Sequence, residues 1–101
     1  MQETIIQMIN NLICCFFAGF FFANGIPHFV KGITKENYPC LFGNRPIPNL
    51  LAGWTMLLVS LIVFHFTVIT KDDFAAQAAV AVGALSIGLF HAGPGAFGAK
   101  S

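Results

Sequence analysis

Residues 4–30 have the sequence TIIQMINNLICCFFAGFFFANGIPHFV, which contains no Asp, Glu, Lys or Arg. Two further uncharged windows follow in the chain, Pro46–Thr70 and Phe74–Ala99. Each window can supply the roughly 20 apolar residues that a helix needs to cross a bilayer core of about 30 Å. The sequence therefore predicts an all-α integral membrane protein with three transmembrane helices.

The composition agrees with a chain that folds in lipid. Of the 101 residues, 56% are hydrophobic and only 9% are charged, and the mean hydropathy is +0.77. Soluble domains carry roughly 25% charged residues, so this chain has too few charges to cover a water-facing surface. Because the connections are short, we expect residues 1–101 to form a single membrane domain. The net charge of +1 offers no basic face for nucleic acid.

Turn-forming and capping residues set the expected ends of the helices. Pro27 is expected either to kink or to end the first helix. Asn49 is expected to cap the second helix, and Asp72 or Asp73 the third. Whether the Gly- and Pro-rich connection between the first two helices dips back into the membrane stays open. The expected helices are about 4–27, 49–70 and 73–92.

Basic residues are unevenly distributed between the two sides. Lys31, Lys35 and Arg45 lie in the first connection and Lys100 in the tail, whereas the second turn holds only Lys71. Since Lys and Arg accumulate in cytoplasmic loops, we expect the N-terminus outside and the C-terminus inside.

One face of the first helix carries most of its polar side chains. Steps of three and four residues place Gln7, Asn10, Cys14, Asn24 and His28 on this face. Polar groups that face lipid are costly, so we expect the face to point toward other helices or a partner chain. Two interpretations remain: a path for a small solute or ion, or hydrogen bonds that hold helices together.

Small residues form seams on the other two helices. They are Gly53, Ser60 and Thr67 in the second helix and Ala81, Ala84 and Gly88 in the third. Small side chains let helix backbones approach closely. We therefore expect these packing seams to join the three helices or to mediate homo-oligomer contacts.

Two histidines are expected at the same depth. His28 and His91 lie at the inner ends of the first and third helices, whereas His65 belongs to the outer part of the second. Such a pair can bind haem iron or a metal, or relay protons. It can also hydrogen-bond carbonyls that a nearby proline leaves without a partner.

The adjacent Cys14 and Cys15 are a second candidate for metal binding. Vicinal cysteines in a membrane helix are similar to those of small mercury transporters, although the rest of that pattern is absent here. Cysteine also packs as a small hydrophobic residue. No metal or cofactor is therefore expected as a resident group, and we expect no disulfide.

Catalytic chemistry finds no support in the sequence. The three uncharged windows lack acids and strong bases, and no Ser–His, metal-ligand or phosphate-loop motif is present. The chain is therefore not expected to be an enzyme. The first window also lacks the carboxylate that small multidrug transporters carry, which argues against proton-coupled drug export of that type.

The segment Phe22–Ile33, FANGIPHFVKGI, resembles a signature of small, uncharacterised bacterial integral membrane proteins. In those proteins an Asn, a Pro-His-Phe and a Gly stand at the end of the first helix, and Pro48–Trp54 resembles the entry to their second helix. The resemblance implies a multi-pass protein of the bacterial inner (cytoplasmic) membrane, without a mechanism. It also directs attention to Asn24, Pro27 and His28 as a unit.

Together these features favour a small membrane protein that acts through assembly, as a homo-oligomer or as an accessory subunit of a membrane complex. One alternative is an oligomeric channel or transporter for a small solute or ion. A further alternative is a haem- or metal-binding membrane subunit. The expected partners are the lipid bilayer and copies of the chain or other membrane subunits, while the substrate and stoichiometry are not specified.

Overall fold

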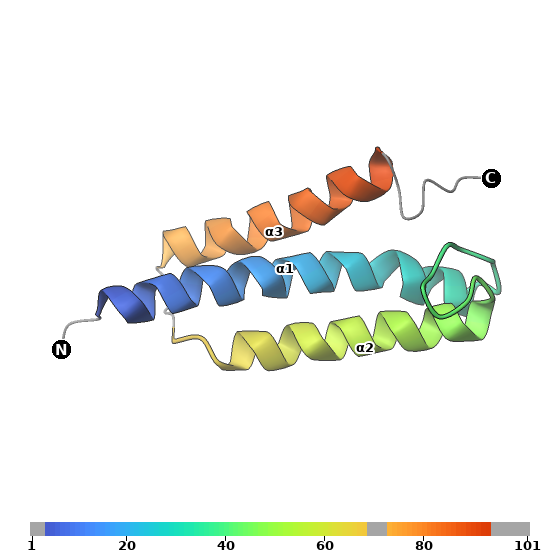
Figure 1. The fold of residues 1–101 in the computed structure, drawn as a ribbon, viewed down its shortest axis with the longest axis horizontal. Coiled ribbons are helices and arrows are strands. Elements are labelled where there is room, and N and C mark those ends of the chain that lie inside the picture. The colour runs from blue at the N-terminus through green and yellow to red at the C-terminus, as the bar shows by residue number, and fades with distance from the viewer. Residues whose placement is uncertain (1–3, 69–72, 94–101) are drawn as a thin grey trace.

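The computed structural model describes residues 4–68 and 73–93, which form three helices (Figure 1). The helices are α1 (Ile5–Ile33), α2 (Pro46–His65) and α3 (Phe74–Ala92). Each of them is long and apolar enough to cross a membrane. This confirms the prediction of an all-helical chain with three helices suited to a bilayer.

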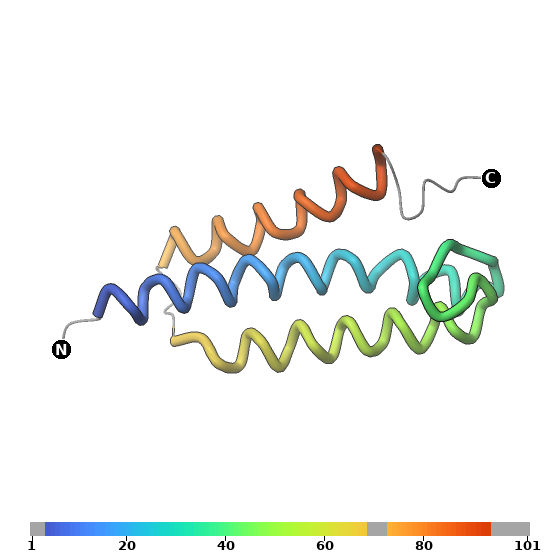
Figure 2. The backbone as a smooth tube through the Cα atoms, in the orientation of Figure 1, coloured from blue at the N-terminus to red at the C-terminus, as the bar shows by residue number. Residues whose placement is uncertain are grey.

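The central helix of the fold is α1. Both α2 and α3 pack against it, and they make few contacts with each other. The backbone trace shows α2 and α3 on opposite sides of α1, with α3 diverging from α1 toward its C-terminal end (Figure 2). The helix α2 thus stays alongside α1, whereas α3 runs at an angle to it.

The helix α1 continues through Pro27. It begins after Thr4, whose side chain accepts a hydrogen bond from the backbone N–H of Gln7, and it ends at Ile33, six residues beyond the expected end at residue 27. Proline is tolerated within membrane helices when neighbouring helices support the segment, and here α2 does so, because Gly32 lies against Leu50. At 1.5 Å per residue α1 is about 43 Å long and α3 about 28 Å, so the last turns of α1 extend beyond α3.

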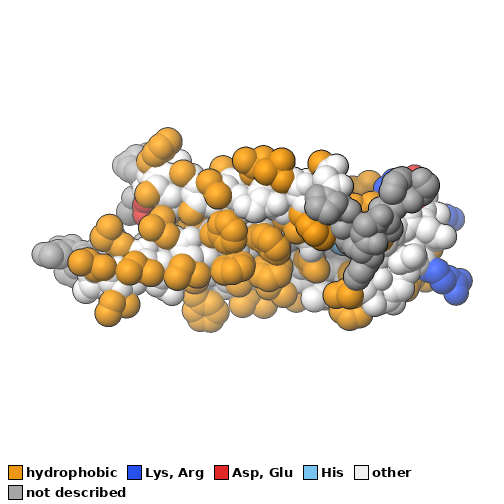
Figure 3. Space-filling model, turned by 45° about the horizontal axis from the view of Figure 1, so that its top comes forward, with side chains coloured by type: hydrophobic (Ala, Val, Ile, Leu, Met, Phe, Trp, Pro, Cys, Tyr) orange, Lys and Arg blue, Asp and Glu red, His pale blue; other side chains and the backbone are white. Residues whose placement is uncertain are grey.

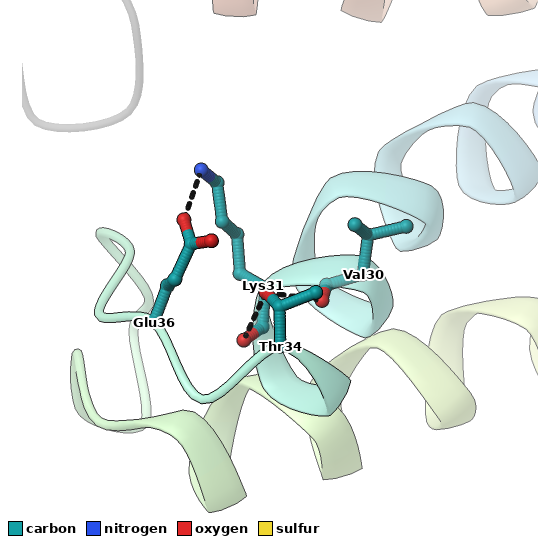
Figure 4. Close-up of polar contacts among 4 residues, drawn as sticks. All are labelled: Val30, Lys31, Thr34 and Glu36. Carbon is teal, nitrogen blue, oxygen red and sulfur yellow. Dashed lines mark hydrogen bonds and ion pairs between the residues drawn. The ribbon is translucent and has the colours of Figure 1, made fainter.

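A Schellman turn ends α1. The backbone N–H of Glu36 donates to the carbonyl of Lys31 (2.9 Å), and the N–H of Lys35 donates to the carbonyl of Gly32 (3.2 Å). Lys35 holds the left-handed position of this motif, with φ of 63°, where glycine is usual. The left-handed backbone costs a non-glycine residue about 1 kcal/mol. Figure 4 shows two further contacts of this turn: the Lys31–Glu36 ion pair (2.7 Å) and the hydroxyl of Thr34, which donates to backbone carbonyls.

The other two helices differ from the expected bounds to different degrees. Proline is favoured in the first turn of a helix, and α2 starts at Pro46 with Arg45 as its N-cap rather than at Asn49. It ends at His65, not at residue 70. For α3 the expected cap is confirmed, because the Asp73 carboxylate accepts from the N–H of Ala76 (3.0 Å). Asp72 lies outside the described residues.

Besides Gly32, which lies against the backbone of Leu50, glycines bring the helices into direct backbone contact at two more places. Gly25 of α1 and Gly53 of α2 face each other, and a Cβ built on Gly25 would lie 2.9 Å from the Gly53 carbonyl oxygen. Gly19 and Gly83 do the same for α1 and α3, because their Cβ atoms would overlap the backbones of Val80 and Phe16. Such close crossings are typical of membrane helix pairs.

Candidate functional site

Polar and aromatic side chains from all three helices and the first connection meet at one end of the bundle. They are Asn24 and His28 of α1, Tyr38 of the connection, Asn49 of α2 and His91 of α3. The ring centroids of His28 and His91 lie 6.1 Å apart, and Tyr38 lies 5.2 Å from His28 and 6.2 Å from His91. We call these five residues the polar cluster.

Asn49 holds the cluster and the connection together. Its side-chain amide donates to the carbonyls of Tyr38 (2.8 Å), Asn44 (3.1 Å) and Arg45 (3.0 Å). The residue is fully buried. A buried side chain with this many backbone partners fixes the path of the chain around it. Asn49 thus acts as a clamp on the connection, not as the helix cap that the sequence suggested.

The orientation of Asn49 determines the tautomer of His28. Because the amide nitrogen of Asn49 is used as a donor, its Oδ1 atom accepts, and Nδ1 of His28 donates to it at 2.6 Å. A neutral histidine then carries its lone pair on Nε2. Within residues 4–68 and 73–93, Nε2 has no hydrogen-bond partner, and no fully buried side-chain nitrogen or oxygen is left unpaired there. The Nε2 atom of His28 is therefore an accessible acceptor at the edge of the cluster.

His91 uses both ring nitrogens inside the cluster. Its Nε2 atom lies 2.6 Å from Oδ1 of Asn24, and its Nδ1 atom lies 3.2 Å from the hydroxyl of Tyr38. The amide of Asn24 donates in turn to the sulfur of Met56 in α2. With its amide committed as a donor, Asn24 accepts from Nε2–H of His91, which leaves Nδ1 to accept from Tyr38. This chain of contacts is what ties the C-terminal end of α3 to α1.

The cluster offers a metal or haem iron only one available ligand atom. Both nitrogens of His91 are engaged, and His28 contributes Nε2 alone. Across the described residues, no three side chains of His, Cys, Asp or Glu gather as metal ligands do. A bound metal at this place would need to displace Asn24 or Tyr38 from His91.

The predicted polar face of α1 is divided by the structure. Asn24 and His28 join the polar cluster, whereas Asn10 is exposed and Gln7 and Cys14 are half-buried near the other end. The buried asparagine there is Asn11, whose side chain donates to the carbonyl of Val68 (2.7 Å) and accepts from its N–H (3.0 Å). The face is thus not a continuous inward stripe within one chain.

The predicted packing seam is divided in the same way. In α2, Gly53 is buried against α1, and the hydroxyl of Ser60 donates to the carbonyl of Ala18 (2.7 Å). Thr67 lies beyond the end of α2 and bonds the carbonyl of Phe64. In α3 the buried residues are Ala76, Gly83 and Ile87, while Ala81 and Gly88 are exposed and Ala84 is half-buried.

The remaining candidates are apart from the cluster. Cys15 is buried and Cys14 contacts Asn10 of the same helix, and all three cysteines, with Cys40, are free thiols. His65 is exposed at the far end of α2, where its ring lies against Phe66.

Comparison of the chain with protein-family models, with curated proteins and with solved structures gives no match.

Proposed function

We propose that the protein is a small multi-pass membrane subunit that acts through assembly, first of all with copies of itself. The observation that supports this is the exposed face of α3. A Cβ built on Gly88 would meet no atom within 4 Å, and Ala81 on the same face is also exposed. Small residues are enriched where membrane helices contact each other, and none of the described helices covers these two positions.

Partly exposed polar side chains also support assembly. Asn24 and His91 lie within apolar helices and are only partly buried by their own chain. Polar side chains in contact with lipid are costly, and a neighbouring subunit on the open side of α3 would shield them. An accessory role in a larger complex would use the same surface with a different membrane subunit.

For the location we propose the bacterial inner membrane, on the strength of the FANGIPHFVKGI segment. The proposed orientation has the N-terminus outside and the polar cluster on the cytoplasmic side. Lys31, Lys35 and Arg45 support it, because they belong to the end of the bundle that carries the cluster, where Figure 3 shows blue side chains. Cysteine labelling of Thr4→Cys and Asn37→Cys in intact cells tests the orientation, since only residue 4 should react from outside.

Substitution of Gly88 tests assembly directly. Gly88→Leu places a bulky side chain on the open face of α3 and should reduce the oligomer to monomers, as read by native mass spectrometry from lipid nanodiscs. Ser86→Leu is the matched control, because Ser86 is exposed on the opposite side of the same turn. Assembly that survives Gly88→Leu unchanged would contradict the proposal.

A second candidate function is favoured by one observation in the polar cluster. The accessible Nε2 of His28, next to the hydrogen-bonded Tyr38, His91 and Asn24, is an arrangement that can accept and pass on a proton or bind a polar solute. In an oligomer this site would stand at the inner mouth of a path between subunits. His28→Gln should then abolish flux in proteoliposomes without changing assembly, whereas His65→Gln should leave flux unchanged. Equal flux in both variants would exclude this function.

A further inference from the structure

A cavity of about 610 Å³, half open to the surface, lies between the C-terminus of α1 and the N-terminus of α2. Its size is within the range of small-molecule sites, which is about 300–1,000 Å³. The lining residues are Gly32, Ile33, Lys35, Arg45, Pro46, Ile47 and Pro48. The wall is thus apolar on the helix side and carries two cationic side chains from the connection.

The two cations of this cavity differ from their neighbour Lys31. Lys31 is neutralised by Glu36 at 2.7 Å and lies 6.0 Å from the ring centroid of Tyr38. Neither Lys35 nor Arg45 has a carboxylate partner within residues 4–68 and 73–93. Positive charge on this side of the molecule is therefore concentrated at the cavity.

The backbone of Lys35 supports a role for its side chain. Lys35 occupies the left-handed position of the Schellman turn, where glycine or asparagine would fit with less strain. A residue that is unfavourable for its own backbone conformation is a pointer to a functional constraint. The turn places this lysine at the cavity, which Arg45 also lines.

The position of the cavity in the fold indicates the class of ligand. It lies at the ends of two helices that are long and apolar enough to cross a membrane, and Ile33 and Ile47 are exposed beside it. An occupant must therefore combine an anionic group for the two cations with apolar chains that continue into the bilayer. Arginine binds phosphate oxygens with two parallel hydrogen bonds, and basic pockets between membrane helices bind lipid headgroups.

We propose that this cavity binds the phosphate of an anionic phospholipid through Lys35 and Arg45, with its acyl chains against Ile33 and Ile47. The lipid would link the connection to the membrane and does not depend on assembly of the chain. Free inorganic phosphate shares the anionic group but lacks the apolar chains.

The test measures which lipids remain bound after extraction. The full chain is reconstituted in vesicles with equal amounts of phosphatidylglycerol and phosphatidylcholine, and retained lipids are counted by native mass spectrometry. A cation near an anionic surface is worth about 1 kcal/mol, or about fivefold, so Lys35→Asn and Arg45→Gln should each lower the ratio of bound anionic lipid about fivefold. Lys35→Arg should keep the ratio. Lys31→Gln is the charge-matched control, because Lys31 does not line the cavity.

Stability and competition give the deciding outcomes. Lys35→Asn should unfold at the same or higher denaturant concentration than the natural chain, because asparagine tolerates the left-handed backbone. Loss of bound lipid without loss of stability thus separates binding from folding. The proposal is overturned if Lys31→Gln lowers the ratio as much as Lys35→Asn does, or if neither cavity variant changes it. It is also overturned if inorganic phosphate displaces the lipid, since the site would then recognise phosphate alone.

Discussion

The two interfaces of α1 use the same glycine-to-backbone contact but are secured differently. Against α2, the contact of Gly25 and Gly53 lies between two sets of hydrogen bonds, those of Asn49 at one end and those of Asn11 at the other. Against α3, Gly19 lies on the backbone of Val80 and Gly83 on the backbone of Phe16, after which the two helices diverge (Figure 1). His91 provides hydrogen bonds near the C-terminal end of α3. Close packing brings a membrane helix to its neighbour, and polar contacts at both ends keep it there.

Substitutions of Gly53 and Gly83 should have the largest effects on stability, and they test whether the two interfaces of α1 differ. Gly53→Val forces a side chain onto the backbone of Phe29 in the interface that is fixed at both ends, and we expect a loss of about 3 kcal/mol. Gly83→Val should cost less, because α3 can move away on its open side. Unfolding in mixed micelles with increasing SDS measures both values. Gly88→Val is the control that should leave the fold intact, and a larger loss for Gly83→Val would reverse the proposed ranking.

Removal of the Asn49 side chain should have the next largest effect. Asn49→Ala leaves the Tyr38 carbonyl and Nδ1 of His28 without their partner, whereas the Asn44 and Arg45 carbonyls keep backbone hydrogen bonds from Tyr38 and residue 49. An unsatisfied buried polar group costs about 1–3 kcal/mol. We expect a loss of about 2 kcal/mol and faster hydrogen exchange in residues 34–45, with α3 unchanged. Asn44→Ala, which removes one side-chain hydrogen bond to Cys40, is the milder control. If exchange rises equally in both variants, Asn49 is not the main clamp.

The effect of His91→Leu should be smaller and local. Side-chain hydrogen bonds between membrane helices average about 0.6 kcal/mol, so the loss of two contacts should cost about 1 kcal/mol. Hydrogen exchange should increase in the C-terminal half of α3, while the α1–α2 interface keeps its protection. Increased exchange across α2 would show instead that the cluster supports the whole bundle.

The smallest effect concerns the exposed ion pair. Lys31 lowers the pKa of the Glu36 carboxyl, chiefly through their hydrogen bond and then through its charge. Because the pKa is lower in the folded chain, any stabilisation is present above the ordinary glutamate pKa and is lost as pH falls through the folded value. Carboxyl NMR of Glu36 should give a midpoint below the usual value of about 4.3, which returns toward it in Lys31→Gln. An unchanged midpoint in that variant would show that the pair does not form in lipid.

The sequence alone predicts the three helices, but it does not predict which residues form the contacts between them. Long uncharged windows specify spans, and helix direction alone puts His28 and His91 at one depth. The packing face of α3 could not be chosen, because Ala76 and Gly83, which are buried, are as small as Ala81 and Gly88, which are exposed. Asn49 stands before an apolar run, which predicts a helix cap. Its role as a clamp depends on the path of the connection between α1 and α2, and sequence periodicity does not predict that path.

The asparagines at the two ends of the α1–α2 pair also bear on the order in which the protein is made. Asn11 binds the backbone of Val68 just after α2, and Asn49 binds the connection just before it. The residues that form these hydrogen bonds all lie within 4–68 and have therefore left the ribosome before α3 is made. We therefore expect the first two helices to enter the bilayer as a finished hairpin, onto which the third helix docks afterwards.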